Sequence, residues 1–87
     1  MDINKPSQAG TLESNDVYVQ LLPNPNGNIE IKLKSIVYKQ FKDQILQVAN
    51  QTLKDLQITS CVLIMDDQGA LDHTIKARIE SAVKRSL

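Results

Sequence analysis

Hydrophobic and polar residues alternate along two stretches of the first third of the chain. The apolar residues take every second position: Val17, Val19 and Leu21 in 17–22, and Ile29, Ile31 and Leu33 in 28–34. Because successive side chains of a strand point to opposite faces, this period of two predicts two strands, each with one buried face. Glu30, Lys32 and Lys34 fall between the apolar residues, so the other face of the sheet should contact water.

Two later stretches have the three- and four-residue apolar spacing of amphipathic helices. The first runs from Ile36 to about Leu56 with Ser35 as a candidate N-cap, and the second from Ala70 to about Arg85. The stripes expected to be buried are Val37 or Tyr38, Phe41, Ile45, Val48, Ala49, Thr52, Leu53 and Leu56 in the first helix, and Leu71, Ile75, Ile79, Ala82 and Val83 in the second.

A continuous apolar run, Cys61–Met65, lies between the two predicted helices and predicts an interior strand. Since it follows a helix, a crossover would place it parallel to the strand at 28–34. Asp66–Gly69 would then turn the chain into the second helix.

The N-terminal region predicts a hairpin. Residues 1–8 are mostly polar and are interpreted as a lead-in segment, while Thr11 and Leu12 are β-prone and precede the turn formers Glu13–Asp16. Residues 23–28 contain two prolines and an Asn-Gly pair, which is typical of a second hairpin corner.

The resulting element order is strand, strand, strand, helix, strand, helix (β-β-β-α-β-α). It predicts an α/β (α+β) two-layer sandwich in which both helices cover one face of a four-stranded mixed sheet. Residues 1–87 are too few for two domains, so we expect a single domain.

Composition excludes several classes of function. Ten acidic residues balance ten lysines and arginines, which argues against a nucleic-acid binder, and no apolar run is long enough for a signal core or a membrane span. Cys61 is the only cysteine and lies in an apolar run, so we expect a buried, inert thiol. These features predict a cytoplasmic protein without a membrane contact.

The residues that most often bind metals or catalyse reactions are poorly placed for either. Asp66, Asp67 and Asp72 lack calcium-ligand spacing and are interpreted as partners of a helix N-terminus, so no metal is expected. His73 has no second histidine one turn away and is interpreted as solvated. The three aromatic residues are too scattered to stack on bases and are assigned to the core or its rim: Tyr18, Tyr38 and Phe41.

Ser14 is the candidate functional residue. It lies at the tip of the predicted turn, where Asn15 can adopt a left-handed conformation. A serine in a polar turn is most often only a turn residue. No base or nucleophile motif surrounds Ser14, so a functional role would require its hydroxyl to accept a modification made by another enzyme.

The stretch Ala9–Val17 resembles the N-terminal signature of the citrate lyase acyl carrier protein (gamma subunit) family. Asn15 is a departure, because family members often have glycine there, but asparagine also tolerates the left-handed region. Further residues look like family positions in the family's order, so that the resemblance covers nearly the whole chain: Ile3-Asn4, Pro6, Val37, Lys39–Phe41, Asp66-Asp67, Gly69–Asp72 and Ala77-Arg78.

The resemblance implies a non-catalytic carrier in which Ser14 holds a phosphoribosyl-dephospho-coenzyme A arm through a phosphodiester. The implied partners are the citrate lyase alpha subunit, an acyl transferase that exchanges acetyl for citryl, and the beta subunit, which cleaves citryl to oxaloacetate. A holo-carrier synthase would attach the arm. Glu13 and Asp16 flank Ser14 and are candidate contacts for basic residues of these partners.

Two alternatives stay open at this stage. Citramalate lyase and malonate decarboxylase use related small subunits with the same kind of arm, so the acyl group is less defined than the carrier role. A plain interaction or scaffold domain, in which Ser14 is an unmodified turn residue, is the alternative from a different class.

Overall fold

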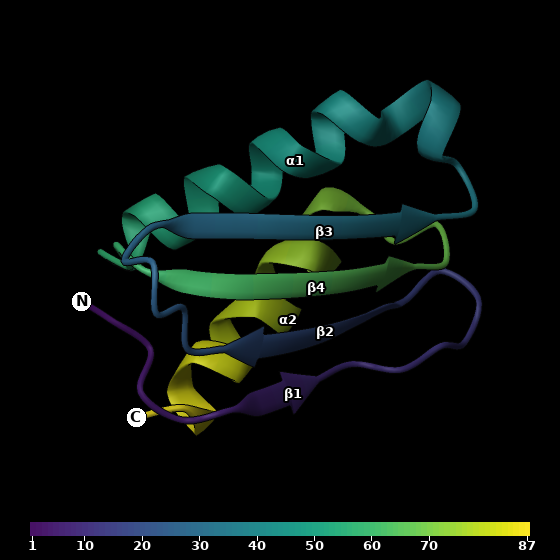
Figure 1. Cartoon of the computed structure of the whole chain (residues 1–87). Helices are drawn as coiled ribbons and strands as arrows, with labels where there is room; N and C mark the ends of the chain where they lie inside the picture. Colours follow the sequence, from purple (N-terminus) through teal and green to yellow (C-terminus); the bar gives the residue numbers. More distant parts are fainter.

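The computed structural model describes all residues, 1–87, and contains the predicted order of elements (Figure 1). Their bounds are β1 Ser7–Ala9, β2 Val17–Leu22, β3 Ile29–Ser35, α1 Tyr38–Asp55, β4 Cys61–Asp67 and α2 Asp72–Arg85. The predicted β-β-β-α-β-α class is confirmed.

The four strands form one mixed sheet in the order β1-β2-β4-β3. β4 is antiparallel to β2 and parallel to β3, as predicted from the intervening helix. The second predicted hairpin is wrong, because β4 lies between β2 and β3. Residues 23–28 instead cross over the end of β4, with a turn in which the amide of Gly27 donates to the carbonyl of Asn24 at 3.1 Å.

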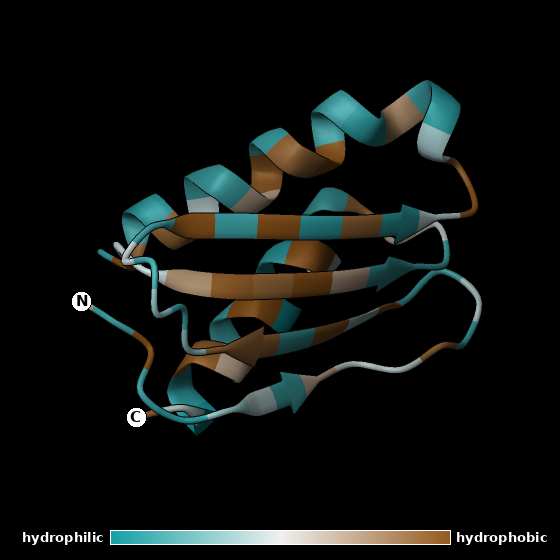
Figure 2. Ribbon diagram, in the orientation of Figure 1, coloured by the Kyte–Doolittle hydropathy of each residue, from teal (hydrophilic) through white to brown (hydrophobic).

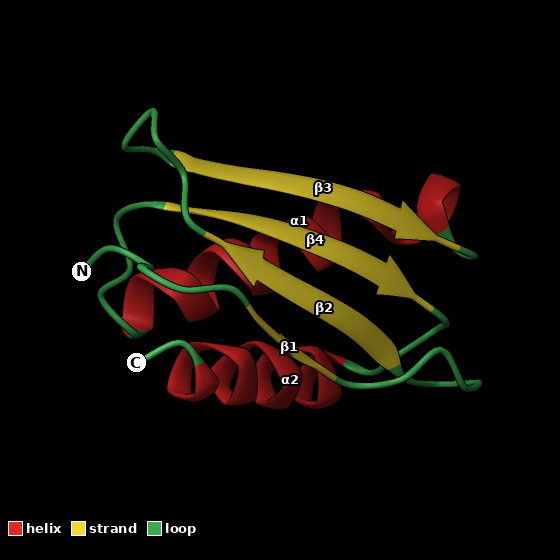
Figure 3. Cartoon of the chain, turned by 60° about the horizontal axis from the view of Figure 1, so that its bottom comes forward, coloured by secondary structure: helices red, strands yellow, loops and turns green.

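Both helices cover the same face of the sheet, as predicted (Figure 3). Alternate residues of β2 and β4 point into the core between the layers, and Figure 2 shows the corresponding alternation along β3. The buried apolar residues form one cluster of 16: Ile3, Ala9, Val17, Val19, Leu21, Ile45, Ala49, Leu53, Ile58, Cys61, Leu63, Met65, Ile75, Ile79, Ala82 and Val83.

The first strand differs from the prediction. It is formed by Ser7–Ala9, within the segment interpreted mainly as a lead-in, and pairs antiparallel with β2. Thr11 and Leu12 belong to the following loop. Ile3 is buried and its amide bonds the carbonyl of Ser60 at 3.2 Å, so the N-terminal segment also contributes to the core.

The start of α1 also differs. The helix begins at Tyr38, and its N-cap is Val37 rather than Ser35. Ser35 ends β3, where its hydroxyl accepts a bond from the Val37 amide at 3.1 Å. The helical spacing places Phe41 in the buried stripe, but Phe41 is 44% exposed because the first turns of α1 stand away from the sheet (Figure 1).

The β4–α2 connection lies two residues later than predicted. β4 extends to Asp67 and α2 begins at Asp72, two residues after the expected start. Leu71 precedes the helix in an extended conformation, so its side chain does not join the buried stripe and is 65% exposed. No helix of the chain combines the length and apolar character needed to cross a membrane.

Candidate functional site

The loop that carries Ser14 joins β1 to β2 at one end of the sheet. The last residues of β3 and β4 lie at the same end, opposite the two chain termini (Figure 1). Glu13, Ser14 and Asn15 are exposed, and Asn15 has the predicted left-handed conformation with φ of 65°. The hydrogen bonds of this loop involve its backbone and the side chains of Thr11 and Asp16, and leave the Ser14 hydroxyl facing solvent.

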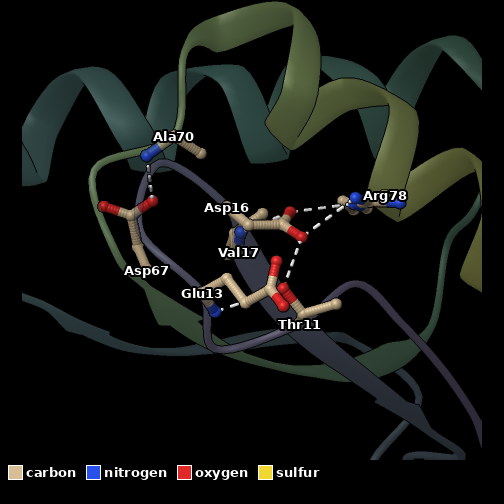
Figure 4. Close-up of polar contacts among 7 residues, drawn as sticks. All are labelled: Thr11, Glu13, Asp16, Val17, Asp67, Ala70 and Arg78. Atoms are coloured by element: carbon tan, nitrogen blue, oxygen red, sulfur yellow. Dashed lines mark hydrogen bonds and ion pairs between the residues drawn. The ribbon is translucent and has the colours of Figure 1, made fainter.

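Asp16 holds the base of the loop from inside the protein. Its carboxylate accepts four hydrogen bonds (Figure 4). The Thr11 hydroxyl and the Val17 amide donate at 2.7 Å, and Nε and one terminal nitrogen of Arg78 each donate at 2.9 Å. The bidentate Arg78 contact ties the loop to the middle of α2.

This environment favours the ionised carboxylate. The hydrogen bonds from Arg78 lower the pKa of Asp16 to about 2, with help from Thr11 and the Val17 amide and against the opposing effect of burial. In turn, Asp16 raises the pKa of Arg78. The suggestion that Asp16 contacts basic residues of a partner is therefore wrong, because the carboxylate is buried and paired within the chain.

A second brace joins the loop to the β4–α2 connection. The Asn15 amide donates to the carbonyl of Gln68 at 2.8 Å, and the Gln68 amide donates to the carbonyl of Asp16 at 2.9 Å. These two bonds continue the ladder between β2 and β4 beyond the strand ends. Ser14 therefore projects from a loop whose base is held by both α2 and β4.

Asp67 organises the neighbouring turn. It is fully buried and accepts bonds from the Ser35 hydroxyl at 2.8 Å and from the Gly69 amide at 3.2 Å. The Ala70 amide donates a third bond at 3.0 Å (Figure 4). Asp66 is also a strand residue, so only Asp72 has the predicted position in the first turn of α2. No group of three or more histidine, cysteine or acidic side chains is arranged to hold a metal ion.

The remaining candidates contribute no chemistry near Ser14. Cys61 is buried as predicted, and burial raises the pKa of its thiol to about 11, as expected for an inert cysteine. His73 is exposed, as predicted for a solvated histidine. Tyr38 and Phe41 are exposed rather than in the core.

Sequence reasoning missed the residues that hold the loop. In the sequence, Arg78 belongs only to the family resemblance, and the pattern predicts Thr11 only as a strand former. A polar Thr11 five positions before Asp16 is a weak signal for the loop's internal bond, whereas Arg78 is brought close only by the packing of α2 on β1 and β2.

Comparison with known proteins finds relatives that match nearly the whole chain. The family model described as malonate decarboxylase delta subunit (MdcD) matches residues 4–86. The chain is 50% identical to the citrate lyase acyl carrier protein of Clostridium perfringens, over 99% of this chain and 85% of the relative. It is 48% identical to the citrate lyase acyl carrier protein of Pectobacterium atrosepticum, over 99% of this chain and 88% of that relative.

Among solved structures, the fold is similar to a chain of a Pseudomonas malonate decarboxylase hetero-tetramer in complex with malonate. The TM-score is 0.71 at 18% identity, and the match covers 100% of this chain and 93% of that one. At this identity the likeness concerns the fold. The near-full-length identity to the curated relatives and the family match show that the chain belongs to the citrate lyase acyl carrier protein family.

Proposed function

We propose that this chain is the acyl carrier subunit of citrate lyase, with a phosphoribosyl-dephospho-coenzyme A arm attached covalently to Ser14. The observation that carries the proposal is the position of Ser14 in a chain of this family. Its hydroxyl faces solvent at the tip of a loop whose base is held by α2 and β4. A modifying enzyme can reach such a group without unfolding the carrier.

The charges around Ser14 fit an anionic attachment. The carboxylate of Asp16 is neutralised by Arg78, so only the exposed Glu13 places an acidic side chain next to the attachment point. Repulsion of the phosphodiester is therefore smaller than two flanking acids would cause. The left-handed Asn15 turns the chain away immediately after Ser14, which leaves room for the attached group.

The proposed role of the chain itself is presentation rather than catalysis. The arm supplies a terminal thiol that carries acyl groups, and the chemistry belongs to the partner subunits, an acyl transferase (alpha) and a citryl lyase (beta). A tethered substrate meets each active site at an effective concentration on the order of millimolar and does not dissociate between steps. A braced loop contributes a defined base for this tether.

A second candidate is the carrier subunit of a malonate decarboxylase. The description of the matching family model and the fold of the Pseudomonas chain favour it. The two candidates share the carrier role and differ in the acyl group and in the partner subunits. Co-purification with a citryl lyase or with a decarboxylase subunit therefore separates them.

The experiment is to measure the intact mass of the chain from cells that make the whole complex. We expect one phosphoribosyl-dephospho-coenzyme A adduct per chain, and the unmodified mass when the modifying enzymes are absent. Ser14→Ala should abolish the adduct and citrate cleavage and change the free energy of unfolding by no more than about 0.5 kcal/mol.

Ser81→Ala is the matched control, because this half-buried serine on α2 lies outside the loop and should keep the adduct. An unmodified chain isolated from an active complex would contradict the carrier proposal and support the plain interaction domain. An adduct on Ser14→Ala would show that the arm is attached elsewhere.

A further inference from the structure

Apolar side chains are exposed mainly at the end of the molecule that carries Ser14. Seven large apolar residues are exposed, and Met1 and Leu87 are the chain termini. The other five lie in the loop after β1, in the β3–α1 and β4–α2 connections, or in the first turns of α1: Leu12, Ile36, Tyr38, Phe41 and Leu71. Exposed apolar residues that gather in this way commonly mark a binding surface.

Two of these residues line a groove between the start of α1 and the β4–α2 connection. The groove has a volume of about 470 Å³. Its apolar lining consists of Val37, Phe41, Ile45, Ala70 and Leu71. At one end the side chain of Gln44 bridges the helices by donating to both oxygens of Asp72, at 3.0 and 3.2 Å.

The groove also reaches the Ser14 loop. Gly69 lines it, and a Cβ placed on Gly69 would lie 3.8 Å from the side-chain oxygen of Asn15 and 3.8 Å from Ile36. Asn15 follows Ser14 directly and is bonded through its amide to Gln68. A flexible group attached to Ser14 therefore starts beside the groove.

We propose that this groove binds the pantetheine and acyl-thiol end of the arm while the carrier is between partners. This inference rests on the proposed attachment to Ser14. The apolar lining suits the hydrocarbon segments of pantetheine, and Gln44 and Asp72 offer polar atoms to its amides. An arm bound in the groove would also cover Phe41 and Leu71, two apolar side chains that are exposed in the chain without an arm.

The tether makes such a shallow site useful. An open groove binds a free ligand weakly, but a group tethered a few residues away is present at an effective concentration on the order of millimolar. Weak binding is also what a carrier requires, because the arm must leave the groove for each partner's active site. The bound acyl group would be shielded from water between transfers.

The test compares the bare and arm-loaded chains by NMR, with the intact mass of each sample measured first. We expect chemical-shift changes at groove residues Val37, Phe41, Ala70 and Leu71 on loading. Leu22 and Val62, on the open face of the sheet, serve as reference positions and should not change. If a chain with the full adduct mass shows shifts confined to residues near Ser14, the groove proposal is wrong while the carrier proposal stands.

A second readout is the rate at which hydroxylamine cleaves the acyl group from the loaded arm. Phe41→Asp and Leu71→Asp should accelerate cleavage about two- to fivefold, because the groove no longer holds the arm. Leu12→Asp places the same charge at an exposed apolar position outside the groove and should cleave at the parental rate. Equal rates in all four proteins would overturn the proposal. Groove shifts that appear in the bare chain only when a partner subunit is added would also overturn it, because they identify a protein-docking surface.

Discussion

The carboxylate of Asp16 and the guanidinium of Arg78 form two parallel hydrogen bonds of 2.9 Å, although the residues are 62 positions apart. The side chain of Asp16 is 12% exposed and that of Arg78 is 39% exposed, so the acid is the buried partner. The pair adjoins Thr11 and Glu13 in Figure 4, and these residues belong to the loop that presents Ser14. Stability and the placement of the candidate attachment site therefore depend on the same contact.

Replacing Arg78 with methionine should lower the free energy of unfolding by about 2 kcal/mol at pH 7. The change keeps much of the side-chain volume but leaves the buried carboxylate of Asp16 without its cation. The measurement is urea unfolding followed by circular dichroism. Lys76→Met, on the exposed side of the same helix, is the control and should stay within about 0.5 kcal/mol of the parent. An equal decrease in the free energy of unfolding in Arg78→Met and Lys76→Met would contradict a specific role of the ion pair.

The same pair predicts how stability depends on pH. Because the pKa of Asp16 is lowered to about 2 in the folded chain, the pair stabilises the fold fully above the ordinary carboxyl pKa of about 4. This contribution is lost as the pH falls from about 5 to about 2. Its size is about 1–2 kcal/mol after allowance for solvent screening at the partly exposed Arg78.

The check is to measure the free energy of unfolding of the parent and of Asp16→Asn between pH 6 and pH 2.5. We expect the difference between the two proteins to be largest at pH 6 and to shrink in acid, because the Asp16 carboxyl takes up a proton at about pH 4 in the unfolded parent but only at about pH 2 in the folded one. A difference that does not change over this range would show that the carboxylate is not the titrating group.

The local patterns of the sequence predicted the strands and their faces well. Val17, Val19 and Leu21 are buried as expected, because the period-two pattern follows directly from strand geometry. The pairing of distant strands was harder to predict. The Asn26-Gly27 turn is compatible with a hairpin, and the local pattern does not show that β4 pairs with both β2 and β3 and so separates them.

Local patterns also predicted part of the site. The preference of these residues for turns predicted the left-handed conformation of Asn15 and the exposure of Ser14. The role of Asp16 could not be predicted, since an acid in a polar turn resembles a solvent-facing residue until α2 packs beside it. Phe41 and Leu71 follow helical spacing, but their exposure depends on how far α1 stands from the sheet and where α2 begins.

Ile45 and Phe41 provide a matched test of which part of α1 faces the core. Ile45 is buried, so Ile45→Asp places an unpaired charge in the core and should remove the cooperative thermal transition. Phe41 lies one turn earlier and is exposed, so Phe41→Asp should melt within a few degrees of the parent. A folded Ile45→Asp variant, or an unfolded Phe41→Asp variant, would show that the helix packs with another face.

Gly10 and Gly27 provide the sharpest comparison of backbone constraints. Both have positive φ, of 88° and 76°, so alanine is strained at either position. A Cβ on Gly10 would lie 1.9 Å from the carbonyl oxygen of Val17 and 3.3 Å from Cδ of Arg78, whereas a Cβ on Gly27 meets no atom within 4 Å. The two substitutions therefore share the conformational cost and differ in the steric one.

Gly27→Ala should cost about 1 kcal/mol, which lowers the Tm of a chain of this size by about 4–8 °C. Gly10→Ala should cost at least about 3 kcal/mol, because the carbonyl of Val17 can move only if β1 separates from β2 where the Ser14 loop begins. Differential scanning calorimetry measures both. Since the clash also pushes against Arg78, Gly10→Ala should lose part of the acid-dependent stability that Asp16 provides, whereas Gly27→Ala should keep it. Equal drops in Tm would mean that β1 and β2 can separate near Gly10 at little cost in free energy. The loop that carries Ser14 would then not be held rigidly at its base.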